Sequence, residues 1–348
     1  MNYIIKHLLK ILSAGIIVCT FLSYVSPYVN PALFGWMAFF GTGFPWLLLA
    51  NVILLVIWAL RKHRFALYHF GILLFGWQYV TGFIGMNLGN DAVPASAVTV
   101  ATHNLGGIFR GINLEEDVWD GIFNGYTGFL RENGDPDILC IQETARKFYP
   151  RLAEIMGYKY TINRKGGTML LSRYPIIDSG DVPFSKSGNS MLWADIRIDK
   201  QVVRVYSVHL YSNRVTGDTE KVLDDPKLEK KETYRGIYKV LRKVGGATGI
   251  RAEQAAVLRK HIDAGPYPVI LCGDFNDTPN AYVYGLLAEG LTDTFREKGL
   301  GIGTTYAGAL PFLRIDYILT DPKIKTYACR VPKGEYSDHY AVVAKLGW

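Results

Sequence analysis

The chain has 348 residues, enough for one large domain with an accessory region, and its charges are unevenly distributed. All 31 Asp and Glu residues lie at Asp91 or later, whereas residues 1–90 carry five basic residues and no acidic one. The remaining 258 residues carry 33 basic and 31 acidic side chains, so most of the formal charge of +7 lies in the first part. This distribution excludes a wholly soluble protein, a disordered chain and a uniformly basic nucleic-acid coat protein.

The first 90 residues have the composition of a membrane region. Residues 11–60 contain no Asp, Glu, Lys or Arg, and such a run exceeds the roughly 20 residues of one span and suits two. Pro27 and Pro31 predict the turn between these spans. A second uncharged run, 65–90, is long enough for a third helix. We therefore predict an N-terminal transmembrane helical region, residues 1–90, with about three helices embedded in a lipid bilayer.

Basic residues near the ends of these spans predict their orientation. Lys6 and Lys10 precede the first span, and the basic segment 61–64 separates the second from the third. Because short cytoplasmic loops are rich in Lys and Arg, the N-terminus and this segment are predicted to be cytoplasmic. A third helix ending near Met86 then places the rest of the chain on the extracytoplasmic side of an integral, multi-pass protein. The alternative is a cleaved signal peptide in 1–25, but no small-x-small cleavage site follows it.

Residues 91–348 have the pattern of one α/β domain. Short apolar runs rich in β-branched residues predict strands at 97–102, 137–141, 168–171, 191–198, 202–210, 269–272, 314–319, 324–329 and 340–345. Helical periodicity occurs at 116–131, around 144–156 and at 251–262. Strands interleaved with helices in this way indicate mixed, largely buried sheets covered by helices.

A highly charged stretch, 213–249, interrupts this pattern. One interpretation is a solvated surface helix or a mobile loop, and the other is a lid or a membrane-surface contact, since the charged residues from Lys239 to Lys243 are all basic. Gly245, Gly246 and Gly249 are predicted to act as hinges.

Polar side chains repeatedly follow the predicted strands at the point where each strand ends or begins. These residues are Asn104, Glu143, His209, Asp274, Asn276, Asp316, Asp338 and His339. Singly, each has an ordinary structural explanation, such as a helix N-cap neighbour for Glu143, a hydrogen-bonded core histidine for His209, or an Asx turn for Asp274. Together they supply hard oxygen ligands suited to Mg²⁺ or Mn²⁺ and two imidazoles.

Other hydrolase classes lack their signatures in this sequence. The chain has no Cys/His cluster with zinc spacing, no G-x-x-x-x-G-K-[ST] loop and no G-x-S-x-G motif. A zinc hydrolase, a P-loop NTPase and a serine hydrolase are therefore excluded.

The order of these motifs resembles that of the endonuclease/exonuclease/phosphatase family, to which pancreatic-type deoxyribonucleases and neutral sphingomyelinases belong. The motifs that carry the resemblance are Asn104, Gln142-Glu143, His209-Leu210, Gly273-Asp274-Phe275-Asn276, Arg314-Ile315-Asp316-Tyr317 and Ser337-Asp338-His339. The resemblance covers residues 97–348. It implies a four-layer α/β sandwich, two packed mixed sheets flanked by helices, with the site at one end of the sheets.

The resemblance also implies roles for the individual residues. Glu143 would be the principal Mg²⁺ ligand, with Asn104 beside it and Asp338 contributing to the metal site. Asp274 would orient or deprotonate the attacking water, and Asn276 would hold a phosphate oxygen. His339, paired with Asp316, and His209 would contact the phosphate and stabilise developing charge or protonate the leaving oxygen. Asp316 beside His339 would favour the charged imidazole next to a phosphate.

Three hypotheses about function remain, and each belongs to a different class of protein. The first is a membrane-anchored, Mg²⁺-dependent phosphoesterase that hydrolyses phosphodiester bonds of phospholipid or other envelope phosphoesters. The second is a membrane-anchored nuclease acting on external DNA or RNA, against which stands the small net charge of residues 91–348. The third is a non-enzymatic receptor or scaffold on the same fold. The sequence identifies no protein partner.

Overall fold

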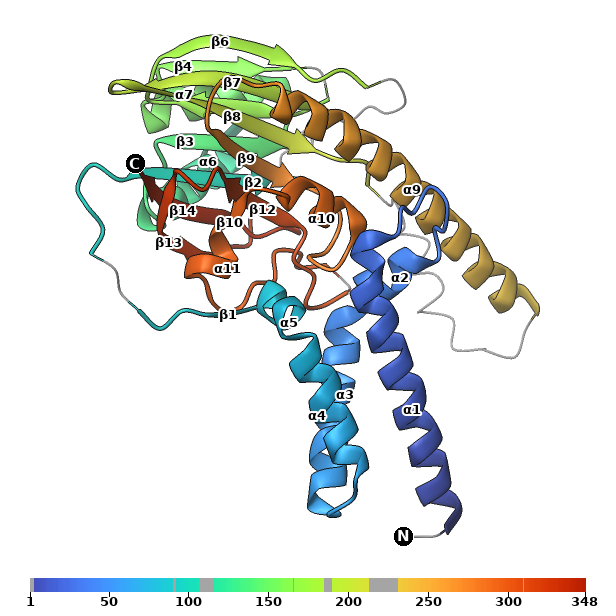
Figure 1. The fold of residues 1–348 in the computed structure, drawn as a ribbon. Coiled ribbons are helices and arrows are strands. Elements are labelled where there is room, and N and C mark those ends of the chain that lie inside the picture. Colours follow the sequence, from blue (N-terminus) through green and yellow to red (C-terminus); the bar gives the residue numbers. More distant parts are fainter. Residues whose placement is uncertain are drawn as a thin grey trace.

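The protein is an α/β domain that stands on a bundle of helices, as the computed structural model shows (Figure 1). The structure describes residues 3–89, 92–106, 116–164, 166–184, 190–212, 231–308 and 310–348. Within these ranges, the N-terminal residues form the bundle and most of the later residues form the α/β domain.

Two six-stranded sheets form the centre of the α/β domain. The first has the order β13-β14-β2-β3-β5-β4 and consists of β2 (Val98–Asn104), β3 (Ile138–Gln142), β4 (Tyr160–Asn163), β5 (Met169–Ser172), β13 (Lys325–Arg330) and β14 (Val342–Gly347). The second has the order β10-β12-β9-β8-β7-β6 and consists of β6 (Ile176–Asp181), β7 (Met191–Ile198), β8 (Gln201–His209), β9 (Val269–Asp274), β10 (Thr292–Asp293) and β12 (Asp316–Thr320). Among these strands, β2 pairs in parallel with β3 and β8 with β9, while the other neighbours are antiparallel.

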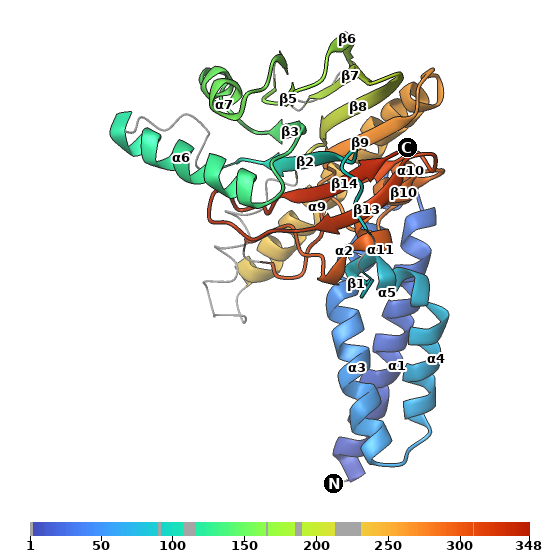
Figure 2. The ribbon, with the colours of Figure 1, turned by 90° about the vertical axis from the view of Figure 1, so that its left-hand side faces the viewer.

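Four layers arise because the sheets pack face to face and helices cover their outer faces (Figure 2). Fully buried side chains such as Val100 fill the space between the sheets. The outer face of the first sheet is covered by α6 (Glu116–Glu132) and α7 (Tyr149–Met156). The outer face of the second is covered by α9 (Lys231–Asp263) and α10 (Tyr282–Ala288). The predicted four-layer α/β sandwich is confirmed.

All nine predicted strands are present. Most of them are buried on both faces and therefore produce continuous apolar runs, whereas β13 is partly exposed. The edge strand β6 was not predicted, since its sequence contains Asp, Ser and Gly and its side chains are half-buried or exposed. The predicted helix around 144–156 begins as a 3₁₀ turn, η2 (Arg146–Phe148), and continues as α7. The short α10 and α11 (Thr294–Lys298) also escaped prediction.

The N-terminal bundle consists of three helices that lie side by side (Figure 1, Figure 2): α1 (Tyr3–Val25), α3 (Phe44–Leu60) and α4 (Phe65–Phe75). Shorter helices join them to the α/β domain: η1 (Ser26–Tyr28), α2 (Met37–Thr42) and α5 (Trp77–Phe83). The N-terminal end of α1 and the connection between α3 and α4 lie at the end of the bundle that is remote from the α/β domain.

The third predicted helix ends earlier than expected. Its helical part stops at Phe83 instead of near Met86, because β1 (Ile84–Met86) pairs antiparallel with β11 (Leu300–Ile302) of the α/β domain. The backbone N–H of Gly303 also donates to the carbonyl of Phe83 at 3.0 Å. The last bundle helix is therefore attached directly to the α/β domain.

The bundle has its polar side chains inside and its large apolar side chains outside. Asn51 and His69 are fully buried, and His69 is the only buried residue of α4. The Nδ2 atom of Asn51 donates to Thr20 Oγ1 at 2.7 Å, and the Nδ1 atom of His69 lies 2.8 Å from Asn51 Oδ1. Exposed apolar residues cover the outer surface; they include Ile4, Leu8, Ile11, Leu12, Val18, Leu49, Val52, Ile53, Val56, Leu67, Phe70 and Leu74.

One described helix is long and apolar enough to cross a membrane by length and composition. It is the continuous segment Tyr3–Tyr28, with 26 residues and a mean hydropathy of 2.0. The helices Phe44–Leu60 and Phe65–Phe75 are apolar but shorter. Only 22% of the apolar window in the first helix is buried by the rest of the protein.

The second part of the charged stretch 213–249 is helical, whereas 213–230 lies outside the described residues. Its glycines lie within α9 and do not form a hinge there. A Cβ atom on Gly35 would lie 3.3 Å from the Cα atom of Gly245, and one on Gly249 would lie 3.6 Å from the Cα atom of Ala32. The glycines therefore allow α9 to approach the segment after α1 closely.

Candidate active site

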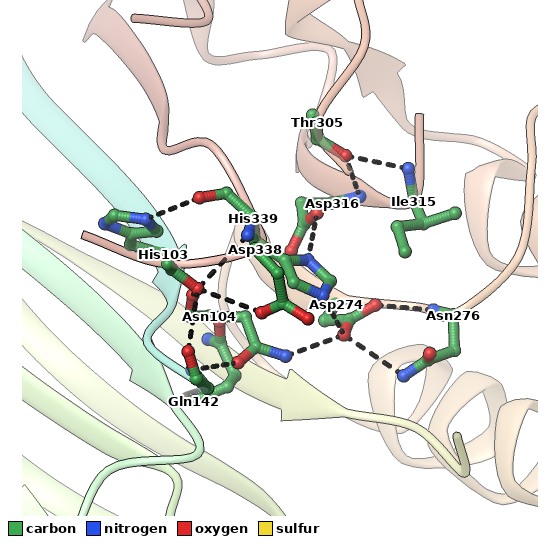
Figure 3. Close-up of polar contacts among 12 residues, drawn as sticks. His103, Asn104, Gln142, Asp274, Asn276, Thr305, Ile315, Asp316, Asp338 and His339 are labelled. Carbon is green, nitrogen blue, oxygen red and sulfur yellow. Dashed lines mark hydrogen bonds and ion pairs between the residues drawn. The ribbon is translucent and has the colours of Figure 1, made fainter. Parts of the chain in front are cut away.

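The two parallel strand pairs end next to one another, one pair from each sheet. Asn104 is in register with Gln142 at the ends of β2 and β3, and His209 is in register with Asp274 at the ends of β8 and β9. Asp316, the first residue of β12, is opposite Asp274. This register explains why polar side chains that are far apart in sequence converge at one place (Figure 3).

A cluster of hydrogen-bonded amide, carboxylate and imidazole groups forms the centre of the site. Asn104 Nδ2 donates to Asp274 Oδ2 at 2.9 Å and to Glu143 Oε1 at 3.3 Å. His209 Nε2 lies 3.2 Å from Glu143 Oε1 and 3.8 Å from Asp274 Oδ2. Glu143 is thus the carboxylate neighbour of His209, which the sequence did not identify.

Backbone geometry at the end of β3 directs Glu143 into this cluster. Glu143 has a left-handed φ of +61°, which is uncommon for a residue with a side chain. A Cβ atom on Gly106 would lie 2.9 Å from Glu143 Oε2 and 3.2 Å from Asn104 Oδ1, so glycine leaves space beside both oxygens. Carboxylate and amide oxygens of this kind are the ligands that Mg²⁺ and Mn²⁺ prefer, so these residues fit a divalent cation.

His339 and Asp316 form a buried pair. The Nδ1 atom of His339 lies 2.9 Å from Asp316 Oδ2, and Thr305 Oγ1 accepts hydrogen bonds from the N–H groups of Ile315 and Asp316. Burial opposes the charge on the imidazole, but the carboxylates of Asp316 and Asp274 outweigh it and raise the pKa of His339 to about 9. The imidazole of His339 is therefore protonated at neutral pH.

Asp274 is almost fully buried and accepts several hydrogen bonds. Its Oδ1 accepts from the N–H of Asn276 at 2.7 Å, and its Oδ2 accepts from Asn276 Nδ2 at 3.1 Å. Burial, followed by the charge of Asp316, raises the pKa of Asp274 above its usual value, although His339 and His209 oppose this shift. A raised pKa makes this carboxylate a stronger base than an exposed Asp.

Two of the predicted site residues, Asp338 and Asn276, are not placed as their predicted roles in metal and phosphate binding would suggest. The side chain of Asp338 is exposed at the rim, where its Oδ1 contacts Ser337 Oγ at 3.3 Å. Both N–H groups of the Asn276 amide are engaged, one with Leu210 O and one with Asp274. Phosphate binding by Asn276 would therefore replace one of these hydrogen bonds.

Among the described residues, one group of three buried side chains has ligand atoms close enough to hold a metal ion. It consists of Asp274, Asp316 and His339, whose ligand atoms all lie within 4.8 Å of one another. This group differs from the predicted metal ligands Asn104, Glu143 and Asp338. Because a metal ligand must be deprotonated and the pKa of His339 is raised in the metal-free protein, a metal ion in this group would have to displace the proton of His339.

Two supporting residues were not singled out from the sequence. His103 is buried one position before Asn104, and its Nε2 atom lies 3.0 Å from the backbone oxygen of His339. Burial lowers the pKa of His103 to about 4, so this imidazole is neutral. Arg251 of α9 is also fully buried, and its Nη1 donates to Tyr211 O at 3.0 Å. The only available signal for His103 was its position directly before Asn104 in a predicted strand, and the helical pattern concealed Arg251.

Residues 101–339 match the Endonuclease/Exonuclease/phosphatase family, so the chain belongs to this family. A separate match covers residues 6–83 and corresponds to a domain of unknown function (DUF8431). A search of curated proteins finds no significant match.

Solved structures with the same fold differ in what they act on. The chain is similar to D. rerio TDP2 complexed with a single-strand DNA product (18% identity, TM-score 0.51, covering 73% of this chain and 100% of that one). It is similar to the human Nocturnin catalytic domain with bound sulfate (15% identity, TM-score 0.51, covering 74% of this chain and 96% of that one). It is also similar to the mannosyl-6-phosphatase Bt3783 of Bacteroides thetaiotaomicron (16% identity, TM-score 0.50, covering 72% of this chain and 100% of that one). At these identities the likeness establishes the fold.

Proposed function

We propose that the protein is a membrane-anchored phosphoesterase that depends on Mg²⁺ or Mn²⁺ and hydrolyses phosphodiester bonds of phospholipid or other envelope phosphoesters. The observation that carries this proposal is the convergence of Glu143, His209, Asp274 and His339 at the ends of the parallel strands. Phosphoryl transfer uses groups of these kinds: hard oxygen ligands for a cation, a base for water and cationic groups beside the phosphate.

Each side chain has a role that its surroundings support. Glu143 and Asn104, with Asp338 at the rim, would hold the cation, which when bound neutralises charge on the phosphate oxygens. Asp274, whose pKa is raised, would orient and deprotonate the attacking water.

The two histidines act on the phosphate side of the reaction. Protonated His339, held by Asp316, would stabilise negative charge on the phosphate. His209, beside Glu143, would contact the phosphate and protonate the leaving oxygen. Asn276 fixes Asp274 through two hydrogen bonds, and its amide would bind a phosphate oxygen by giving up one of its present hydrogen bonds.

The membrane part of the proposal is supported by the inverted polarity of the bundle. Apolar side chains outside and hydrogen-bonded polar side chains inside are the arrangement expected for helices that face lipid. We infer that α1, α3 and the pair α4–α5 each cross the bilayer, which divides the chain into a membrane region, 1–90, and a catalytic domain, 91–348.

The orientation is supported by where the basic residues lie. Lys6 and Lys10 belong to the first turns of α1, and the segment 61–64 connects α3 with α4. Both parts lie at the end of the bundle that is remote from the α/β domain (Figure 1). By the positive-inside rule this end is cytoplasmic, and the catalytic domain is extracytoplasmic.

The full-length protein in detergent, supplied with Mg²⁺ or Mn²⁺, tests this function. Mixed phospholipid micelles and plasmid DNA are incubated in parallel, with EDTA and Asp274→Asn as blanks. We expect metal-dependent release of phospholipid headgroups that is lost in both blanks. Plasmid cleavage with intact lipid would instead identify a nuclease, and inactivity on both substrates with no metal binding would favour a scaffold.

A further inference from the structure

A cavity lies at the junction between the bundle and the α/β domain. Its volume is about 540 Å³, and its walls include Tyr28 and Tyr79 from the bundle and Asn280, Tyr282 and Arg296 from the α/β domain. The described residues that line it include none of the proposed catalytic or metal-binding residues. We refer to this cavity as the junction pocket.

One wall of the junction pocket contains an amide without hydrogen bonds. Asn280 is fully buried, and neither its Nδ2 nor its Oδ1 has a partner among the described residues. The position of Asn280 is fixed by close packing, since a Cβ atom on Gly41 would lie 2.5 Å from its backbone oxygen. A buried amide without partners is unfavourable. Because Asn280 is fully covered, its amide lies behind the wall of the junction pocket, and the polar contacts available to a ligand come from the exposed side chains of the lining.

The charged side chains of the junction pocket have opposite signs. Arg296 is exposed, and its Nη2 donates to the carbonyl of Gln78 at 3.2 Å, which leaves other N–H groups of the guanidinium for a ligand. Glu289 supplies the single acidic side chain of the lining. Tyrosine rings account for much of the remaining wall, and aromatic faces attract ammonium groups. One cation, one anion and several aromatic rings match a ligand that carries both a phosphate and an ammonium group.

The location of the junction pocket indicates the source of such a ligand. It lies where the bundle meets the α/β domain, and Tyr28 of η1, Trp36 directly before α2 and Trp77 of α5 are exposed. Exposed Trp and Tyr side chains at this level are typical of the membrane–water interface. We propose that the junction pocket binds the zwitterionic headgroup of a membrane phospholipid, with its phosphate at Arg296 and its ammonium group at Glu289. This inference rests on the proposed membrane insertion and does not require hydrolysis.

Native mass spectrometry of the delipidated full-length protein tests this inference. The protein is incubated in detergent and EDTA with phosphatidylethanolamine, with phosphatidylglycerol, or with water-soluble glycerophosphoethanolamine. We expect one retained phosphatidylethanolamine per chain, at least about 10-fold weaker retention of phosphatidylglycerol, and no retention of the soluble compound. Equal retention of the two lipids, or retention of the soluble compound, would overturn the proposal.

Two variants assign the bound lipid to the junction pocket. Arg296→Gln should reduce retention of phosphatidylethanolamine about 10-fold, whereas Glu289→Gln should remove the preference over phosphatidylglycerol. The matched control is Arg197→Gln, which changes an exposed arginine of β7. Both test residues are exposed, so the variants should fold, and circular dichroism confirms this. Retention that is unchanged in Arg296→Gln would contradict the inference even if the protein hydrolyses phospholipid, and lipid binding without hydrolysis would leave it intact.

Discussion

The bundle and the α/β domain place polar and apolar side chains in opposite ways. In the α/β domain, apolar residues such as Val100 and Ile270 are fully buried between the sheets. In the bundle, Asn51 and His69 are fully buried while Ile53 is half exposed. One chain thus contains two regions whose polarity suits two different surroundings, water for the first and lipid for the second.

The buried polar groups of the two regions also differ in what they contact. In the α/β domain, Asn104, Asp274 and His339 are gathered at the strand ends, where they contact one another and the other residues of the candidate site. In the bundle, Asn51 bonds to Thr20 and His69 in the interior and connects α3 with α1 and α4. The buried polar side chains therefore form the candidate active site in the α/β domain, whereas in the bundle they connect the helices to one another.

The largest expected effect comes from Asp274→Asn. The substitution keeps the shape of the side chain but removes the base, so hydrolysis per folded molecule should fall by about 10²–10⁴-fold. The thermal unfolding temperature should also fall, because the amide NH₂ cannot accept the hydrogen bonds that Asp274 accepts. Initial rates and thermal unfolding measure the two quantities. The control is Asp263→Asn, which changes an exposed carboxylate at the end of α9. Equal rates in both variants would remove Asp274 from the proposed mechanism.

An acidic residue on the outer surface of the bundle should have the next largest effect. Ile53 lies near the middle of α3 and is 50% exposed, so Ile53→Asp would place a carboxylate in lipid. The cost is about 2.5–3.5 kcal/mol for a charged residue at a helix centre, and less protein should resist alkaline extraction from membranes. Ile177→Asp is the matched control, because Ile177 is 40% exposed on β6 of the α/β domain. If both variants stay equally in the membrane fraction, the bundle does not face lipid at this position.

The sequence predicted more of the α/β domain than of the contacts between the two regions. Its buried strands are visible as apolar runs, and residues such as Asn104 and Asp274 are visible because they end these runs. The partner of His209 was not predictable, because Glu143 reaches it across the two sheets from a left-handed turn. Likewise, β1 is a short segment that becomes a strand only through pairing with β11, more than 200 residues later.

The charge on His339 can be tested by its pH dependence. Its pKa is about 9 in the folded protein, above the value of about 6.5 for an unperturbed His. The stabilising contribution of this pair is therefore complete below pH 6.5 and is lost as the pH rises through about 9. In Asp316→Asn, burial would no longer be offset by the nearest carboxylate, so the pKa of His339 should fall by more than about one unit. NMR titration of the imidazole in the metal-free protein measures this pKa, and an unchanged value would show that Asp316 does not hold the charge.

The smallest expected effect is that of Asn51→Leu in the interior of the bundle. The variant removes the donor to Thr20 Oγ1 and leaves His69 Nδ1 without the Oδ1 atom that it contacts. In a membrane such hydrogen bonds contribute only about 0.6–1.7 kcal/mol, because partly separated helices also find polar partners. The free energy of unfolding in detergent should therefore decrease by this amount, while the rate of hydrolysis per folded molecule stays the same. Val52→Leu, a change on the exposed face of the same helix, is the control. A loss of activity in Asn51→Leu without loss of stability would mean that the polar interior of the bundle serves the catalytic site, and the functional separation of the two regions would then be wrong.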